Sequence, residues 1–244
     1  MAKRTFDVFF SLLILVIIFP IFFLVLILIY FEDFKNPLYT PKRVGKDNKD
    51  FTFIKFRSMK LDADKTGVDS TSANDSRITS IGFFIRRYKI DELSQLLNVL
   101  IGDMSLVGPR PNVRRDVDLY SSQEMKLLSV RPGITDFSSI VFADEGDILV
   151  GYDDPDLAYN QLIRPWKSRL GILYIENHST FLDIKLLFLT ILSLFSRKKA
   201  LKKLCLILKN LNADSNVIKA ASRLEELVPY PPPGIDSIVE SRNS

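Results

Sequence analysis

The sequence is very poor in the residues that form disulfide frameworks and histidine-rich metal sites. It contains one cysteine, Cys205, and one histidine, His178, in 244 residues. A lone cysteine excludes an internal disulfide framework and a cysteine-based metal site, and a lone histidine excludes a multi-histidine metal site. The chain also lacks a Walker P-loop, a glycine-rich dinucleotide fingerprint and a paired-histidine motif. Any chemistry is therefore expected to depend on carboxylates and basic side chains.

The composition predicts an apolar segment attached to one main globular domain. The hydrophobic fraction of 47% and the mean hydropathy of +0.11 are high for a chain with 25% charged residues. A length of 244 residues suits one domain with an anchor and a tail. The net charge of +4 suits a surface that faces anionic lipid or phosphorylated substrates. Nothing supports nucleic acid as a partner, and none is expected.

One long hydrophobic run lies near the N-terminus. Every residue from Val8 to Phe31 is apolar or aromatic except Ser11 and Pro20. Because about 20 such residues cross a bilayer as a helix, the run predicts a membrane-inserted segment. It is too long for the hydrophobic region of a cleaved signal peptide. Pro20 removes a helical hydrogen bond in the middle of the run, which predicts a kink.

Basic residues flank both ends of this run, so the positive-inside rule gives no clean orientation. Two topologies stay open. One is a kinked transmembrane helix, and the other is a re-entrant segment that would put both basic flanks on the cytosolic side. The flanking residues are Lys3, Arg4, Lys35, Lys42, Arg43 and Lys46.

The segment after the anchor predicts a strand, a polar loop and two helices. Phe51 to Phe56 alternates as a short strand does, and Leu61 to Arg77 is polar. Ile78 to Tyr88 predicts a short helix. Asp91 to Leu100 predicts a second helix with leucines on one face, which Gly102 is placed to end.

The C-terminal third predicts a helix at the membrane surface and a flexible tail. Phe181 to Phe195 is strongly apolar but too short to span, so an in-plane interfacial helix is favoured over a buried core helix with a solvated basic end. The chain beyond Asn212 runs through Pro231–Pro233 to a polar end, which predicts a flexible tail. Between them lies a basic cluster that could hold anionic headgroups: Arg197, Lys198, Lys199, Lys202 and Lys203.

Asp91 and Glu92 are the first candidates for chemistry. They stand at the start of a predicted helix, directly after the basic residues Arg86, Arg87 and Lys89. In one interpretation Asp91 only caps the helix. In the other, the helix start receives a phosphate, and a carboxylate, a divalent metal and arginines share one site. The residues alone leave both interpretations open.

Two rigid segments each present an arginine. Val107 to Pro111 is stiffened by two prolines, which would hold Arg110 in place to grip phosphate oxygens with two donors. A solvated arginine in an ordinary proline turn is the alternative. Arg131 to Thr135 repeats the pattern with a proline and a glycine.

Two other polar groups are expected to be ordinary surface features. His178 has no acid or nucleophile pattern around it. The acidic residues Asp144, Glu145 and Asp147 could bind a cation, but a solvated acidic loop is the favoured interpretation.

Four ordered blocks of the chain closely resemble the bacterial sugar transferase family, the monotopic phosphoglycosyl transferases. The resemblance runs from about Lys3 to Phe195 and favours a catalytic Asp91 over a cap. Four blocks in order are far more specific than any one of them. The blocks are Lys55–Met59, Asp91–Leu100, Gly102–Pro111 and Arg131–Thr135.

The resemblance implies an α/β fold, mostly helical with short strands, in a monotopic membrane protein. It implies a re-entrant membrane helix over residues 1–34, bent at Pro20, although Phe19 replaces the family's usual serine. Residues 35–197 would form a cytosolic catalytic domain with interfacial amphipathic helices, and residues 198–244 a basic segment with a flexible C-terminal tail. The expected location is the bacterial inner membrane, with the catalytic domain on the cytosolic face. A homodimer stays open.

The implied reaction has two steps. Asp91 attacks the phosphate that carries the sugar of a UDP-sugar, UMP leaves, and a covalent phosphosugar-enzyme results. Polyprenyl (undecaprenyl) phosphate then attacks this intermediate and restores the aspartate. Mg²⁺, held partly by Asp91, would neutralise phosphate charge while Glu92 assists. Arg86, Arg110 and Arg131 would bind phosphates.

One departure from the family pattern bears on sugar recognition. Many members continue after Thr135 with Gly-Trp and an Asn-Gly-Arg-Asn element, whereas this chain has Asp136 and Phe137, with Ala143 about where the arginine would fall. A catalytically silent membrane scaffold of the same fold is therefore the alternative function. A single-pass anchored binding module is a further one.

Overall fold

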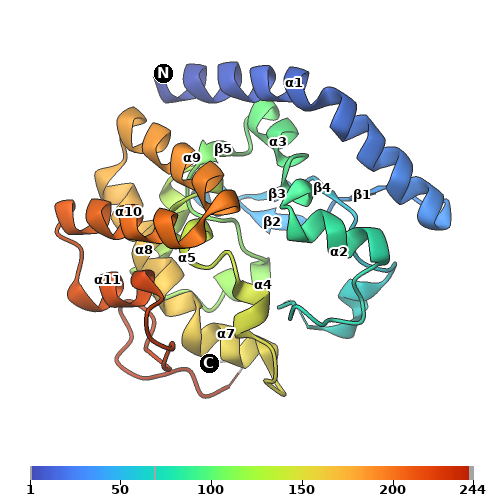
Figure 1. The fold of residues 1–244 in the computed structure, drawn as a ribbon. Coiled ribbons are helices and arrows are strands. Elements are labelled where there is room, and N and C mark those ends of the chain that lie inside the picture. The colour runs from blue at the N-terminus through green and yellow to red at the C-terminus, as the bar shows by residue number, and fades with distance from the viewer. Residues whose placement is uncertain (1, 69, 242–244) are drawn as a thin grey trace.

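The computed structural model describes residues 2–68 and 70–241, and it is mostly helical with short strands, as expected (Figure 1). Three two-stranded sheets lie among the helices: β1 with β4 and β2 with β3 are antiparallel, and β5 with β6 is parallel. The strands are β1 (Leu38–Tyr39), β2 (Lys42–Val44), β3 (Asp50–Thr52), β4 (Lys55–Phe56), β5 (Ser105–Val107) and β6 (Gly133–Thr135). The helices are α1 (Ala2–Asp33), α2 (Ser80–Arg87), α3 (Gln95–Ile101), α4 (Arg114–Val117), α5 (Phe137–Val141), α6 (Glu145–Ile148), α7 (Pro155–Leu162), α8 (Arg164–Asn177), α9 (Thr180–Phe195), α10 (Arg197–Asn210) and α11 (Ser215–Ser222), with short 3₁₀ turns η1 (Lys46–Asn48), η2 (Ala63–Thr66), η3 (Ile90–Glu92) and η4 (Glu124–Ser129).

Helix α1 contains the long hydrophobic run. Within the described residues it is the one helix long and apolar enough to cross a membrane. Its side chains are mostly exposed, whereas the core helix of a soluble protein would be mostly buried. Figure 1 shows that α1 bends along its length, as expected for a helix with an internal proline, here Pro20. The chain stays helical throughout the bend.

Both ends of α1 are tied to the same globular body. Near the N-terminus, Lys3 Nζ lies 2.7 Å from the buried Asp183 carboxylate and donates to the Val107 carbonyl on β5. At the other end, the Arg57 guanidinium donates two hydrogen bonds of 2.6 Å to the Asp33 carboxylate. Helix α1 therefore lies across one side of the body and does not project away from it (Figure 1).

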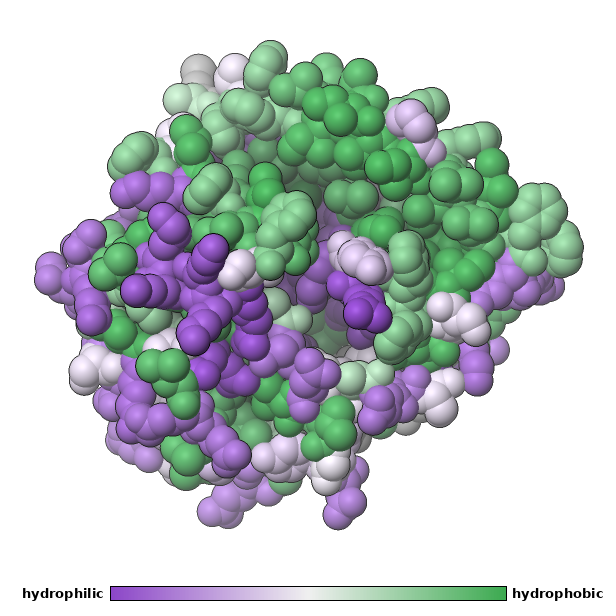
Figure 2. All heavy atoms as spheres, viewed as in Figure 1, coloured by the Kyte–Doolittle hydropathy of each residue, from purple (hydrophilic) through white to green (hydrophobic). Residues whose placement is uncertain are grey.

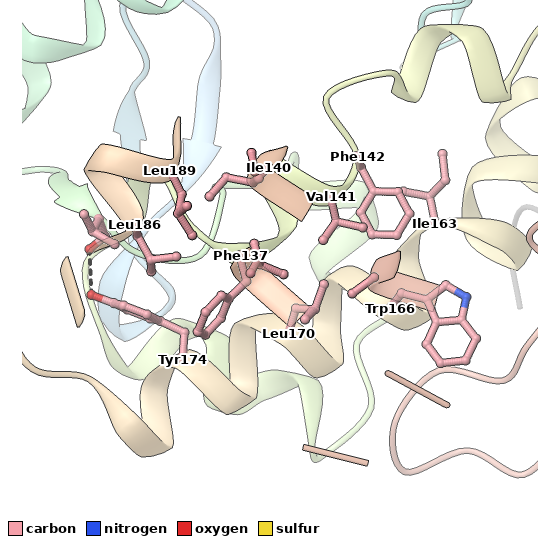
Figure 3. Packing of buried hydrophobic residues seen from close by; sticks show 14 of the residues in the cluster. Phe137, Ile140, Val141, Phe142, Ile163, Trp166, Leu170, Tyr174, Leu186 and Leu189 are labelled. Carbon is pink, nitrogen blue, oxygen red and sulfur yellow. Dashed lines mark hydrogen bonds between the residues drawn. The ribbon is translucent and has the colours of Figure 1, made fainter. Parts of the chain in front are cut away.

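The main core surrounds helix α5. Figure 3 shows the α5 side chains between those of α8 and α9, with Phe137 beside Tyr174 and Ile140 beside Leu189. The rings of Phe137 and Tyr174 meet edge to face at 6.4 Å between centroids. A second, smaller core joins α1 to α2 and η3. Its buried members are Val25, Ile29, Phe56 and Ile85.

Two predicted elements are divided in the structure. The single strand predicted over Phe51 to Phe56 is two strands, because the chain leaves β3 at Phe53 and the Ile54 amide donates to Asn98 Oδ1 on α3. The helix predicted from Asp91 is a 3₁₀ turn followed by α3, which begins at Gln95. Gly102 ends α3 with a left-handed φ of 109°, as predicted.

The prediction of a flexible tail beyond Asn212 is wrong for residues 213–241. Helix α11 buries Val217 and Ala221, and Val239 is also buried. Tyr230 stacks on Trp166 with ring centroids 4.4 Å apart. Apolar and aromatic side chains at intervals thus hold this proline-rich segment against α7, α8 and α10. Residues 242–244 of the predicted tail lie outside the described part of the chain.

Candidate active site

Asp91 lies on the 3₁₀ turn η3 and is only 4% exposed. Its neighbours Ile90 and Leu93 pack on the small core beneath α1 and α2, which fixes the turn. Asp91 Oδ2 lies 2.7 Å from Nζ of Lys55, which β4 places opposite the turn. Asp91 Oδ1 is buried and has no hydrogen-bond partner within the described residues. One carboxylate oxygen is thus paired and the other is free.

Basic side chains keep this carboxyl ionised. Burial acts to raise the pKa of Asp91, but Lys55, with contributions from Arg86 and Lys89, outweighs burial and lowers it below the usual value. Burial likewise lowers the pKa of Lys55, and Asp91 partly offsets that effect. Arg86 lies in the last turn of α2 and Lys55 lies on β4, so two different elements supply the positive charge near Asp91.

Glu92 and Arg110 form the second ion pair of the site. Arg110 Nη1 lies 2.9 Å from Glu92 Oε1. The negative charge of Glu92, with a smaller contribution from Glu145, raises the pKa of Arg110 above its ordinary value, although burial acts to lower it. The loop that carries Arg110 is held by close backbone contact, since a Cβ on Gly133 would lie 2.0 Å from the Gly108 amide nitrogen. The rigid turn predicted around Gly133 therefore supports the Arg110 loop.

The structure does not bring Arg131 to this cluster. The Arg131 side chain is exposed, and its Nε donates a 2.7 Å hydrogen bond to the carbonyl of Gly102. Gly102 follows the last turn of α3, whereas Asp91 precedes the first. The whole length of α3, with about 1.5 Å of rise per residue, therefore lies between Asp91 and Gly102. Of the predicted site residues, Asp91, Glu92, Arg86 and Arg110 are brought together.

Three charged residues of the site, Lys55, Lys167 and Glu145, are not assigned to it by the sequence reasoning. Lys55 lay inside a block used only for the family resemblance, and no pattern singled out Lys167. Glu145, on α6, pairs with Lys167 on α8. Burial acts to raise the pKa of Glu145, but Lys167 and then Arg110 outweigh it, so the pKa is lowered. The expected solvated loop is therefore wrong for Glu145, and also for Asp144, which accepts from Arg197 and Arg223.

The surface around the site is divided by polarity. Figure 2 shows a hollow with hydrophilic side chains near the centre of this face, bordered by apolar surface over α1 and α2. Exposed apolar side chains on α2 include Phe83 and Phe84. His178 lies at the surface, as expected, and its Nδ1 contacts the carbonyl of Ile175.

Comparison with known proteins places the chain in a family. The model of the family described as "Bacterial sugar transferase" matches residues 1–197, and the chain belongs to that family. It is 37% identical over 208 residues to the exopolysaccharide production protein PSS of Rhizobium leguminosarum bv. phaseoli, covering 81% of this chain and 96% of that one.

Two further relatives are longer proteins. Over 205 residues the chain is 40% identical to the undecaprenyl-phosphate glucose phosphotransferase of Komagataeibacter xylinus, covering 81% of this chain and 36% of that one. Over 192 residues it is 34% identical to the UDP-N-acetylgalactosamine-undecaprenyl-phosphate N-acetylgalactosaminephosphotransferase of Aeromonas hydrophila. That match covers 78% of this chain and 42% of the relative. The chain thus spans less than half the length of these two relatives.

Proposed function

We propose that this protein transfers a sugar 1-phosphate from a UDP-sugar to undecaprenyl phosphate, a polyprenyl phosphate, and releases UMP. The observation that carries the proposal is the buried Asp91 carboxylate, with one oxygen unpartnered and cationic side chains around it. The names of two relatives, an undecaprenyl-phosphate glucose phosphotransferase and an undecaprenyl-phosphate N-acetylgalactosaminephosphotransferase, support the same reaction class. The product would start the assembly of a bacterial glycan on its lipid carrier.

In the first step the free Asp91 oxygen attacks the phosphorus that carries the sugar. A bond forms between Asp91 Oδ1 and phosphorus, and the bond from that phosphorus to the bridging oxygen breaks, so the electron pair leaves with UMP. In the second step an oxygen of the polyprenyl phosphate attacks the same phosphorus. The bond to Asp91 breaks, and the carboxylate is restored.

The neighbouring charges have separate roles in this proposal. The lowered pKa keeps Asp91 ionised and ready to attack at neutral pH. Arg86 and Arg110 would bind phosphate oxygens as charge develops on them. Glu92 holds the Arg110 guanidinium at 2.9 Å. Arg131 has no phosphate-binding role in this proposal, because its Nε already donates to the Gly102 carbonyl at the far end of α3.

The site fits a magnesium ion whose coordination shell would be completed by the substrate. The described residues contain no group of three or more acidic, histidine or cysteine side chains that could hold a metal alone. The unpartnered Asp91 oxygen is, however, the hard oxygen donor that Mg²⁺ prefers, and Mg²⁺ usually binds one or two carboxylates together with phosphates and water. When bound, the ion would neutralise part of the negative charge of the phosphates.

We further propose that the protein lies in the bacterial inner membrane as a monotopic protein, with α1 re-entrant and the site on the cytosolic face. A helix that crossed the bilayer would separate its ends, whereas Lys3 and Asp33 bind the same body. The exposed apolar faces of α1 and α9 would contact membrane lipids. Helix α9 buries one side and exposes Phe181, Phe188 and other apolar residues on the other, which suits an interfacial helix.

The test measures UMP release by the purified 244-residue protein with Mg²⁺, polyprenyl phosphate and a panel of UDP-sugars. We expect turnover with at least one donor and none after Asp91→Asn. Asp153→Asn is the matched control, because Asp153 is an exposed aspartate outside the site. Full activity of Asp91→Asn would overturn the mechanism. A folded wild-type protein that releases no UMP with any donor would favour the silent scaffold.

A further inference from the structure

Helix α10 presents a basic surface that the proposed reaction does not use. It begins where the match to the family model ends, at residue 197. One side of the helix is buried against the core through Ala200, Leu201, Leu204 and Leu208. The other side carries exposed lysines: Lys198, Lys199, Lys202 and Lys203.

These lysine charges are not neutralised inside the protein. No side chain of the four makes an ion pair or hydrogen bond with another residue in the part of the chain that the structure describes. Lys198 and Lys202 are four residues apart, as are Lys199 and Lys203, and like charges at this spacing destabilise a helix. Arg197 differs, because it is paired with Asp144. The basic face therefore gains from an external anion.

The neighbouring helix α9 determines which kind of anion fits. Helices α9 and α10 pack side by side, and Figure 1 shows α9 between α10 and α1. Figure 2 shows apolar surface over α1 and α9 and hydrophilic surface below it, where α10 lies. Lysines at the border of an apolar face can reach the headgroup layer while that face enters the acyl region. The exposed apolar residues of α9 are Phe181, Ile184, Phe188, Ile191, Leu194 and Phe195.

We propose that the lysine face of α10 binds the anionic headgroups of membrane phospholipids. The proposal rests on the membrane location proposed above and adds a lipid class to it. Each lysine near an anionic membrane surface strengthens the binding of the protein to that surface by about fivefold, and four lysines act together here. The occupant is the bilayer itself, because the apolar face of α9 borders the lysines and needs an apolar partner. The segment beyond the family match thereby selects anionic membranes.

The test follows the labelling of lysines by an amine-reactive reagent with mass spectrometry. The 244-residue protein is placed in nanodiscs of phosphatidylcholine alone, or of phosphatidylcholine with phosphatidylglycerol. We expect α10 lysines to react about fivefold more slowly in the anionic discs, and high salt to reverse this. Lys46 and Lys49, which are exposed on and after η1, serve as internal controls and should not change.

A second measurement compares the phosphatidylglycerol retained by variants after purification from mixed micelles. The variant K198Q/K199Q/K202Q/K203Q should lose retained phosphatidylglycerol but not phosphatidylcholine, and K46Q/K49Q should lose neither. Equal labelling in both discs, or equal retention by both variants, would overturn the proposal. So would protection of α10 by inorganic phosphate in neutral discs, which would indicate a general anion site. Neither measurement needs a UDP-sugar, so failure here is separate from failure of the transferase.

Discussion

Nζ of Lys55 and Oδ2 of Asp91 lie 2.7 Å apart, and both side chains are largely buried. The lysine is the closest positive charge to the carboxyl proposed as nucleophile, and it is the main reason that the pKa of Asp91 is lowered in spite of burial. Its removal should therefore change the pH at which the enzyme is active.

We expect Lys55→Met to shift the acid limb of UMP release to higher pH. In the proposed mechanism Asp91 acts as a carboxylate, so activity would be lost as the pH falls through its pKa. Without Lys55, burial dominates and raises that pKa, and the loss begins at a higher pH. The measurement is a pH profile of single-turnover UMP release, with the exposed Lys60→Met as control. An unchanged profile in Lys55→Met would contradict the assignment.

Arg110→Lys should lower kcat/KM for the donor by about 10- to 100-fold, because lysine cannot copy the two-donor geometry that a guanidinium offers to phosphate or to Glu92. Arg114→Lys is the matched control, since Arg114 is partly exposed and pairs with Asp50 away from the site. Steady-state kinetics with varied donor give the comparison. Equal losses in the two variants would mean that Arg110 has no special contact with substrate.

Removing one partner of the buried pair of Arg164 and Glu124 should strongly destabilise the domain. Their side chains are 3% and 0% exposed, and Nη2 lies 2.8 Å from Oε2. Arg164→Met leaves the Glu124 charge unpaired and should cost about 3 to 5 kcal/mol of unfolding free energy. The double variant E124Q/R164M should recover much of the loss. Chemical denaturation in detergent measures both, and a double variant no more stable than Arg164→Met would refute this account.

The C-terminal segment can be followed through the only tryptophan of the sequence, Trp166. Trp166 is 5% exposed and is covered by Tyr230. Tyr230→Ala should therefore shift the tryptophan emission to longer wavelength and lower the Tm. Tyr152→Ala, at an exposed position, should do neither. If emission is the same in all three proteins, Tyr230 does not pack on Trp166 of α8 in solution.

The sequence predicts local structure well where one local force decides it. The apolar run near the N-terminus, the helix stop at Gly102 and the position of α2 all follow from hydropathy, backbone freedom and periodicity. It predicts less where a tertiary contact decides. The Ile54 amide donates to Asn98 Oδ1, which interrupts the predicted strand, and no residue near Ile54 in the sequence predicts this contact.

The site shows the same division. Asp91, Glu92 and Arg110 were found because they lie in short motifs with special neighbours. Lys167 on α8 and Glu145 on α6 are brought together only by the tertiary fold, so their spacing in the chain carries no signal. Arg131 was grouped with Arg110 because both lie beside prolines, yet the close contact between Gly108 and Gly133 makes the second turn a support for the first.

Lys3 and Asp33, at opposite ends of a helix of 32 residues, hold the same body. In the proposed re-entrant arrangement, a reporter fused to the N-terminal end of α1 would lie in the same compartment as Asp91. In that arrangement the helix would also take up area in one leaflet and leave the other leaflet uninterrupted. The protein should accordingly approach only those lipid-linked acceptors whose phosphate lies in the leaflet that it occupies.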